Sequence, residues 1–175
     1  MARDDLVIAI TRALDALAGS RPAEGFLVRA VPGRSAYLIG TDPDGRTALV
    51  VPQDRAWADE PTWPALELAN LRYLPSVRSQ IREGANDISE RDVAVVLIDA
   101  AGTDFENLLP ALLAGVISAA GESPSSQQLG RAVRGLRDVF QSLTRDAIAS
   151  YVGTWGELFV MATAADPALL AAAWG

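Results

Sequence analysis

The change in apolar periodicity at Asp99 constrains the fold of this chain more than any other feature. Before it, apolar residues fall in short alternating or continuous runs, and Val93 to Ile98 forms a continuous run typical of a strand covered on both faces. After it, apolar residues recur every three or four positions, as in amphipathic helices. We therefore predict an α+β fold, with an antiparallel-rich sheet in the N-terminal half followed by a helical C-terminal half.

The first hundred residues contain the signals of one helix and several strands. Asp4 and Asp5 begin a helix in which Leu6, Ile10, Leu14 and Leu17 recur at helical spacing, and Gly19 ends it. An Asp44-Gly45 pair predicts a tight turn between two strands of a hairpin. The strands we expect are Phe26 to Val31, Ala36 to Ile39, Thr47 to Val51, Leu66 to Arg82 and Val93 to Ile98.

Two amphipathic helices are predicted after Asp99. The first carries a wide apolar stripe from Phe105 to Ile117 and ends at Gly121. A Ser-rich turn, residues 123–126, then supplies N-cap groups for a second helix. The apolar stripe of that helix consists of Leu129, Val133, Leu136, Phe140 and Leu143. We expect an N-terminal domain over residues 1–102 and a helical region over 103–175, with a nuclease-like core starting near residue 147.

The segment of residues 52–65 combines three prolines with Trp57 and Trp63. We interpret it as an ordered surface loop anchored in the core by its tryptophans, because buried indoles bring a large apolar area. Exposed tryptophans on a contact surface are the alternative interpretation.

The residue inventory excludes most classes of enzyme. All 15 positively charged side chains are Arg, and the 175 residues include no Lys, His or Cys. Imidazole bases, thiolate nucleophiles, zinc sites of Cys or His and lysine Schiff bases are therefore excluded. Carboxylate chemistry with a hard metal such as Mg²⁺ is the chemistry that remains.

Arginines gather at two places in a chain whose net charge is −7. Arg131, Arg134 and Arg137 share one side of the second helix and are candidates for contacts to a DNA backbone. Arg78 and Arg82 alternate along a predicted strand, but the acids nearby favour a solvated face. A solvated or salt-bridged surface is also the alternative for the helix.

The segment after residue 146 places Glu157 among bulky apolar residues, behind Gly153 and Gly156. The sequence Tyr-Val-Gly-Thr-Trp-Gly-Glu-Leu-Phe-Val of residues 151–160, and the order of elements before it, resemble the bacterial PD-(D/E)XK motif proteins. These are restriction-endonuclease-like proteins of anti-phage defence islands. The resemblance is specific around Gly153 to Val160 and loose over residues 1–145.

The resemblance implies a Mg²⁺-dependent core in which three acids hold the metal and a Lys helps to activate water. Glu157 matches the helix glutamate of that pattern and is the catalytic candidate; a structural glutamate is the alternative. No Asp strand or Glu-X-Lys strand is present, so we expect these beyond Gly175 and expect the given chain to lack nuclease activity.

Two functions from different classes follow. The first is the N-terminal region of a Mg²⁺-dependent DNA endonuclease in a phage-defence or restriction system. The second is a non-enzymatic adaptor or scaffold module that docks a partner ATPase or nuclease subunit. A small-ligand-binding domain has less support, because no glycine-rich phosphate loop is visible. The absence of a signal or membrane-spanning pattern predicts a cytoplasmic protein, and the apolar late helices predict a homodimer or a hetero-complex.

Overall fold

A computed structural model describes residues 3–54, 57, 63–84, 87–100 and 106–138 of the chain. One compact unit extends from Met1 to Leu136, and a second consists of Arg137–Gly175. The boundary expected near residue 102 falls inside the first unit, which we call the barrel unit. Within the described part of the chain, no helix has both the length and the apolarity that crossing a membrane requires.

Six strands form one sheet that closes on itself. Its order is β1-β2-β3-β6-β5-β4, and β1 also pairs with β5, so five of the strands make a barrel with β4 outside it. All neighbours are antiparallel except β1 and β5, which are parallel from Phe26 opposite Ile81 to Val28 opposite Glu83. The strands are β1 (Phe26–Val31), β2 (Arg34–Thr41), β3 (Thr47–Pro52), β4 (Leu66–Glu67), β5 (Leu71–Glu83) and β6 (Asp87–Ile98).

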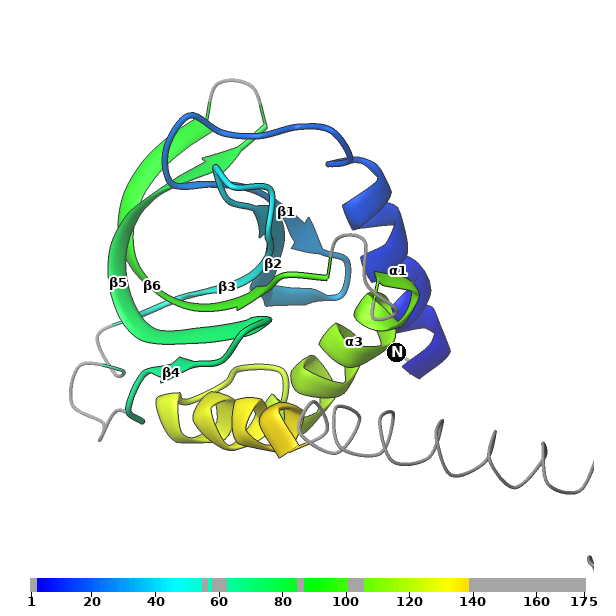
Figure 1. The fold of residues 1–175 in the computed structure, drawn as a ribbon, viewed down its shortest axis with the longest axis vertical. Coiled ribbons are helices and arrows are strands. Elements are labelled where there is room, and N and C mark those ends of the chain that lie inside the picture. Colours follow the sequence, from blue (N-terminus) through cyan, green and yellow to red (C-terminus); the bar gives the residue numbers. More distant parts are fainter. Residues whose placement is uncertain (1–2, 55–56, 58–62, 85–86, 101–105, 139–175) are drawn as a thin grey trace, which may run out of the picture. The chain divides into compact units, whose positions relative to one another are not determined.

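The length and bend of β5 allow the closure (Figure 1). Its pairing with β6 shifts register between Leu74 and Val77, where Pro75 cannot donate a ladder hydrogen bond. The first part of β5 pairs with β4, and its last three residues pair with β1. A bulge of this kind bends a strand strongly, and here the bend lets one strand serve two neighbours.

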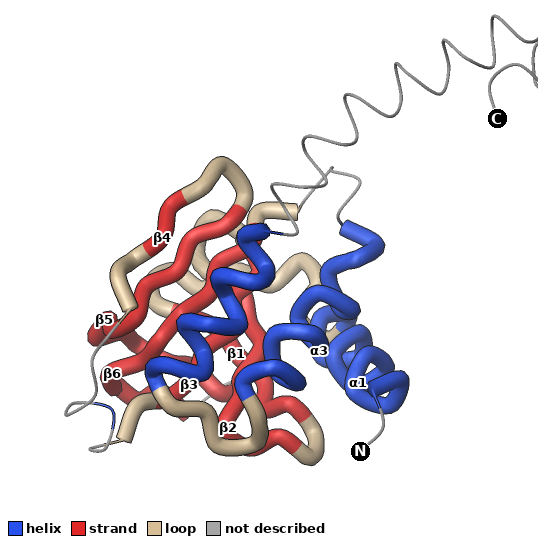
Figure 2. Tube along the Cα trace, turned by 90° about the horizontal axis from the view of Figure 1, so that it is seen from below, coloured by secondary structure: helices blue, strands red, loops and turns tan. Residues whose placement is uncertain are grey.

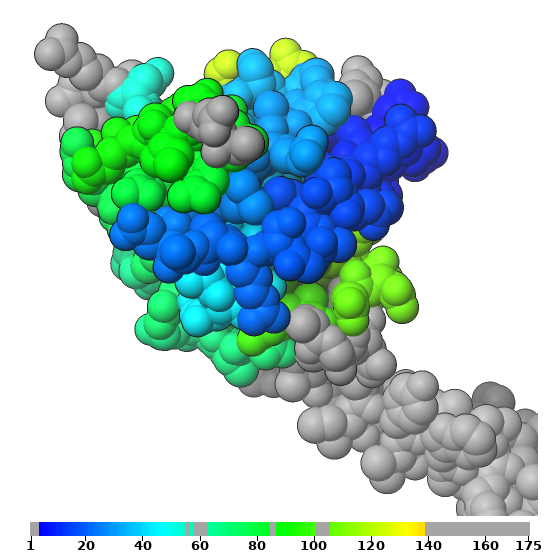
Figure 3. Space-filling model, turned by 90° about the horizontal axis from the view of Figure 1, so that it is seen from above, coloured from blue at the N-terminus to red at the C-terminus, as the bar shows by residue number. Residues whose placement is uncertain are grey.

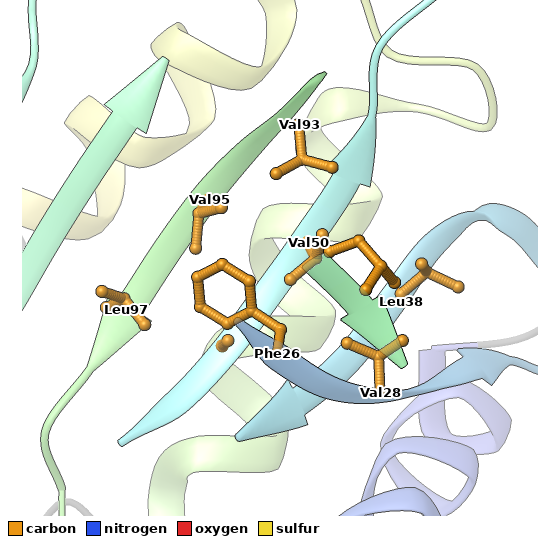
Figure 4. Packing of buried hydrophobic residues seen from close by; sticks show 9 residues of the cluster. Phe26, Val28, Leu38, Val50, Val93, Val95 and Leu97 are labelled. Atoms are coloured by element: carbon orange, nitrogen blue, oxygen red, sulfur yellow. The ribbon is translucent and has the colours of Figure 1, made fainter. Parts of the chain in front are cut away.

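The barrel interior is filled by side chains from alternate positions of the strands. Phe26 lies among them, with valines and leucines of β2, β3 and β6 around it (Figure 4). The alternate residues of the central strands point outward and are buried too, including Tyr37, Leu49 and Val96. The run Val93 to Ile98 is therefore covered on both faces, as its continuous apolarity predicted.

Helices cover the outer face of the barrel, on one side of it (Figure 2). They are α1 (Arg3–Asp15), α3 (Leu109–Ala120), which follows a 3₁₀ turn at Glu106–Leu108, and a helix whose described part is residues 126–138. α1 packs against α3, β1 and β2. The side chains of Leu113 and Ile117 in α3 and of Leu129 in the last helix are fully buried.

The second predicted helix begins with reciprocal hydrogen bonds. The amide of Gln128 donates to Ser125 Oγ at 3.2 Å, and the amide of Ser125 donates to Gln128 Oε1 at 2.9 Å. This Ser-X-X-Gln capping box satisfies amides that a helix start otherwise leaves unpaired. The N-cap role expected of the Ser-rich turn is confirmed. Phe140 and Leu143, which the predicted stripe includes, lie outside the described residues.

The predicted α+β class is confirmed, and two details are wrong. Leu66 to Arg82 is not one strand, because a turn at residues 68–70, closed by a 2.8 Å bond from Leu68 N to Leu71 O, separates β4 from β5. In α1 the buried position after Ile10 is Ala13, whereas Leu14 is half-buried. The order Leu6, Ile10, Ala13, Leu17 follows the 3.6-residue period more closely.

Both tryptophans of residues 52–65 are anchored. Trp57 is buried. The ring of Trp63 lies on the last helix, where a Cβ added to Gly130 would come within 2.1 Å of Trp63 Cδ1. The guanidinium of Arg134 stands 4.1 Å from the centroid of the same ring. The interpretation of these side chains as core anchors is therefore supported for both residues.

Candidate functional site

Of the site residues that the sequence suggested, the structure describes the three arginines and not the glutamate. Glu157, the catalytic candidate, lies outside the described residues. Arg131 is exposed, whereas Arg134 stacks on Trp63 and Arg137 Nε donates to Asp138 Oδ1 at 2.9 Å. Two of the three arginines proposed for a DNA backbone therefore have partners within the protein.

The arginines of β5 are also engaged with acids. Arg78 Nε lies 3.0 Å from Glu90 Oε1, and Arg78 Nη1 lies 3.8 Å from Asp92 Oδ2. These pairs are exposed and contribute little to stability, as surface ion pairs generally do. They agree with the interpretation of this strand face as a solvated, salt-bridged surface.

A search of the described residues for metal-ligating clusters finds no group of three or more His, Cys, Asp or Glu side chains suited to holding a metal ion. The Mg²⁺ site implied by the family resemblance stays a prediction about the segment that contains Glu157. The surface of the barrel unit has two hollows among the described residues that could hold a ligand.

The first hollow, of about 520 Å³, lies where α1 ends, β6 ends and α3 begins. Asp15, Arg21 and Asp99 contribute charges to it, and the turn between β2 and β3 forms another wall. In that turn the buried Asp42 accepts hydrogen bonds from Arg46 N at 2.8 Å and from Arg46 Nε at 2.7 Å. The side-chain bond raises the pKa of Arg46. Ala100 and Glu106 both line the hollow, and the residues between them lie outside the described part of the chain, so its outer wall is undefined.

The second hollow is a groove of about 740 Å³ between α1 and β1, which we call the α1–β1 groove. Figure 3 shows the face on which it lies, with α1 and the chain after it running beside the β5–β6 hairpin. One wall comes from α1 and the residue after it, the other from β1, and the end of β5 closes it. The residues that line the groove include Ile8, Ala9, Arg12, Ala16, Val28, Arg29, Ala30, Glu83 and Gly84.

An open strand edge borders the α1–β1 groove. β5 pairs with β1 only as far as Val28 opposite Glu83, and the chain then turns away at Gly84, whose φ of +83° favours glycine. Arg29 and Ala30 continue β1 and pair with β2, but no described strand lies on their other side. Unpaired main-chain groups of this kind are a template for a further strand.

The side chains along this edge are exposed and mixed in character. Ile8, on α1, is one of the few large apolar side chains exposed among the described residues, with half of its surface accessible. Arg12 and Arg29 are exposed on opposite walls. Within the described residues neither arginine forms an ion pair, whereas Glu83 lies 3.5 Å from Arg91. The groove therefore combines unpaired main-chain groups, an apolar contact and uncompensated positive charge.

Sequence reasoning missed these residues because each is unremarkable in its own element. Arg12 belongs to the polar side of a helix, and Arg29 is a single charged residue within an otherwise apolar strand. Ile8 was the available signal, since it is an apolar residue outside the buried stripe of α1. Only the packing of α1 against β1 brings the two walls together, and the end of β5 closes the groove.

Comparison of the chain with protein-family models, with curated proteins and with solved structures finds no match in any of the three.

Proposed function

We propose that the barrel unit is a non-enzymatic interaction module that binds a segment of a partner protein in the α1–β1 groove. The observation that carries this proposal is the early end of the β5–β1 pairing, which leaves Arg29 and Ala30 with an open edge inside a groove. Proteins usually cover, bend or charge such an edge, because it otherwise pairs with other chains. Here it is accessible and lies beside the exposed Ile8.

The chemistry of the groove supports binding rather than catalysis. Its lining supplies small apolar side chains, an open edge and arginines, which together can hold an extended polypeptide by main-chain hydrogen bonds, packing and charge. The partner belongs to a hetero-complex in this proposal. The class of function is the adaptor that the sequence suggested, but the sequence suggested docking through the helical half and the proposed surface is the α1–β1 groove. The endonuclease hypothesis stays a prediction, because Glu157 and the expected catalytic strands lie outside the described residues.

The predicted homodimer is not required by the described helices. That prediction depended in part on the two helices after Asp99, of which Leu113, Ile117, Leu129 and Val133 are buried within the barrel unit. Leu108, just before α3, is nearly half exposed and is the exception among the residues of that stripe that the structure describes. The prediction depended also on residues 140–174, which lie outside the described residues. Self-association therefore stays a prediction to be tested by light scattering.

A selection from a random peptide library tests the proposed function. The full chain serves as bait, and each selected peptide is tested against Ala16→Trp, which fills the groove with an indole. Ala119→Trp on α3 is the matched control, since Ala119 is equally exposed and lies away from the groove. We expect Ala16→Trp alone to abolish binding. Peptides that bind the two variants equally well would place the binding surface elsewhere and contradict the proposal.

A further inference from the structure

The charges on the walls of the α1–β1 groove indicate what kind of segment it accepts. Arg12 and Arg29 have no ion-pair partner among the described residues, although the chain carries more acids than bases overall. Several other arginines of the barrel unit are paired, such as Arg46 with Asp42 in the turn between β2 and β3, and Arg91 with Glu83. Two unpaired guanidinium groups facing one groove favour a ligand that carries negative charge.

The acids of the groove do not cancel this charge. Glu83 at the end of β5 is already paired with Arg91. Asp5 lies nearer the opposite end of α1 from Arg12, and the separation of seven positions corresponds to about 10 Å along the helix axis. The positive region therefore extends across the groove from Arg12 on α1 to Arg29 on β1.

The open edge sets the conformation of the ligand. A segment lying in line with β5 beyond Gly84 reaches the free side of Arg29 and Ala30 in the position that a neighbouring strand would occupy. Successive side chains of such a segment point to opposite sides, so every second residue faces the arginines. A nucleic-acid duplex has no peptide main chain that could pair in this position.

We propose that the α1–β1 groove binds an extended acidic peptide, which pairs with the edge of β1 at Arg29 and Ala30 and directs carboxylates toward Arg12 and Arg29. The inference rests on the proposed function and adds the charge and conformation of the bound segment. Glutamate or aspartate occupies every second position of the preferred ligand, on the side that faces Arg12 and Arg29.

Fluorescence anisotropy with the full chain and labelled decapeptides tests the inference. The first probe alternates Glu and Val, the second alternates Lys and Val, and the third is the Glu-Val peptide with N-methyl groups along one edge. We expect binding of the first probe, at least about tenfold weaker binding of the other two, and weakening by added salt. The double variant Arg12→Glu/Arg29→Glu should lose about tenfold in affinity for the first probe. Arg131→Glu, on the exposed side of the last helix, should change it less than about twofold.

The outcomes separate the inference from the proposed function. Equal binding of the Lys-Val peptide, sensitive to Ala16→Trp, would overturn the acidic preference and leave the interaction module intact. Equal binding of the N-methylated peptide would overturn strand pairing. Absence of binding by all three probes, while library peptides bind in the groove, would contradict the proposed ligand class alone. Binding of a DNA duplex in competition with the Glu-Val peptide would instead replace it with a polyanion site. Circular dichroism of each variant confirms that it is folded, and a variant that unfolds is replaced by Arg12→Gln or Arg29→Gln.

Discussion

The hydroxyl of Tyr37 donates a hydrogen bond of 2.6 Å to the carbonyl oxygen of Gly121, which joins β2 of the barrel to the residue that ends α3. An ion pair between Arg34, the first residue of β2, and Glu122, the residue after Gly121, lies beside this hydrogen bond in sequence. Tyr73, the other fully buried tyrosine, has no hydrogen-bond partner for its hydroxyl among the described residues. The two phenols therefore differ in what they contribute to stability.

Removing the Tyr37 hydroxyl and removing the Tyr73 hydroxyl should have different effects on the free energy of unfolding. Tyr37→Phe should lower the free energy of unfolding by about 1 kcal/mol, since it leaves the Gly121 carbonyl without its donor. Tyr73→Phe should leave stability unchanged or raise it by up to about 1 kcal/mol, because it removes a buried hydroxyl that is not hydrogen-bonded. Urea unfolding of the two variants measures both values. Equal losses in the two variants would contradict the assignment of the hydrogen bond.

Alkaline pH should destabilise the protein through the same tyrosines. Burial raises the pKa of Tyr37 and of Tyr73 from 10.0 to about 12. Between these values the unfolded chain has released the phenolic protons and the folded chain has kept them, so the free energy of unfolding falls as pH rises. The expected loss is on the order of 2 kcal/mol per tyrosine.

Urea unfolding just below pH 10 and near pH 12 measures this loss, and the variant with both tyrosines replaced by Phe is the control. The double variant should lose less stability over that interval than the parent protein. A loss of the same size in both proteins would show that other groups cause the alkaline destabilisation.

Closure of the barrel at the start of β1 should depend on Gly25. A Cβ at this position would lie 2.2 Å from the backbone oxygen of Gln80 in β5, and the φ of Gly25 is +67°. Gly25→Ala should therefore cost more than about 3 kcal/mol, from steric overlap and backbone strain together. Gly19→Ala is the matched control, because Gly19 has a φ of +76° but no atom near its added Cβ. It should cost only about 1–2 kcal/mol, and equal costs for the two would contradict the close approach.

The docking of the last helix through Trp63 predicts opposite effects for two helical glycines. Gly130→Ala should destabilise the protein by about 1–3 kcal/mol, because the new Cβ would overlap the Trp63 ring, although alanine is the better helix former. Gly135→Ala has open space around its Cβ and should stabilise by about 0.5–1 kcal/mol. Thermal unfolding compares the two variants. A stabilised Gly130→Ala would show that the helix does not rest on Trp63.

Local patterns in the sequence predicted the elements but not the way they close. β1 was predicted with the bounds that the structure has, and the run in β6 was predicted as a strand covered on both faces, because alternation and burial leave a signal within a few residues. The parallel pairing of β1 with β5 leaves none, since it joins residues more than fifty positions apart. It depends on the bend at Pro75 and on the absence of a side chain at Gly25.

The candidate site shows the same limit. Arg131, Arg134 and Arg137 were grouped because their spacing places them on one side of a helix, and Arg134 instead stacks on Trp63, a residue distant in sequence. Arg12 and Arg29 were not grouped, because one belongs to a helix and the other to a strand. Whether an arginine on one element has a partner on another element depends on the tertiary structure, which local sequence patterns do not predict.

Amide hydrogen exchange of the full chain, with and without the Glu-Val peptide, shows whether the peptide pairs with the edge of β1. A strand added beside β1 takes up free main-chain groups of that strand and reduces its contact with water. We expect slower exchange at whichever amide of Arg29 and Ala30 faces the open edge, because the amide of the other residue faces β2, and also along α1 near Ile8 and Arg12, with no change in α3. Protection confined to the residue 126–138 helix or to the first hollow, with unchanged exchange at Arg29 and Ala30, would contradict it.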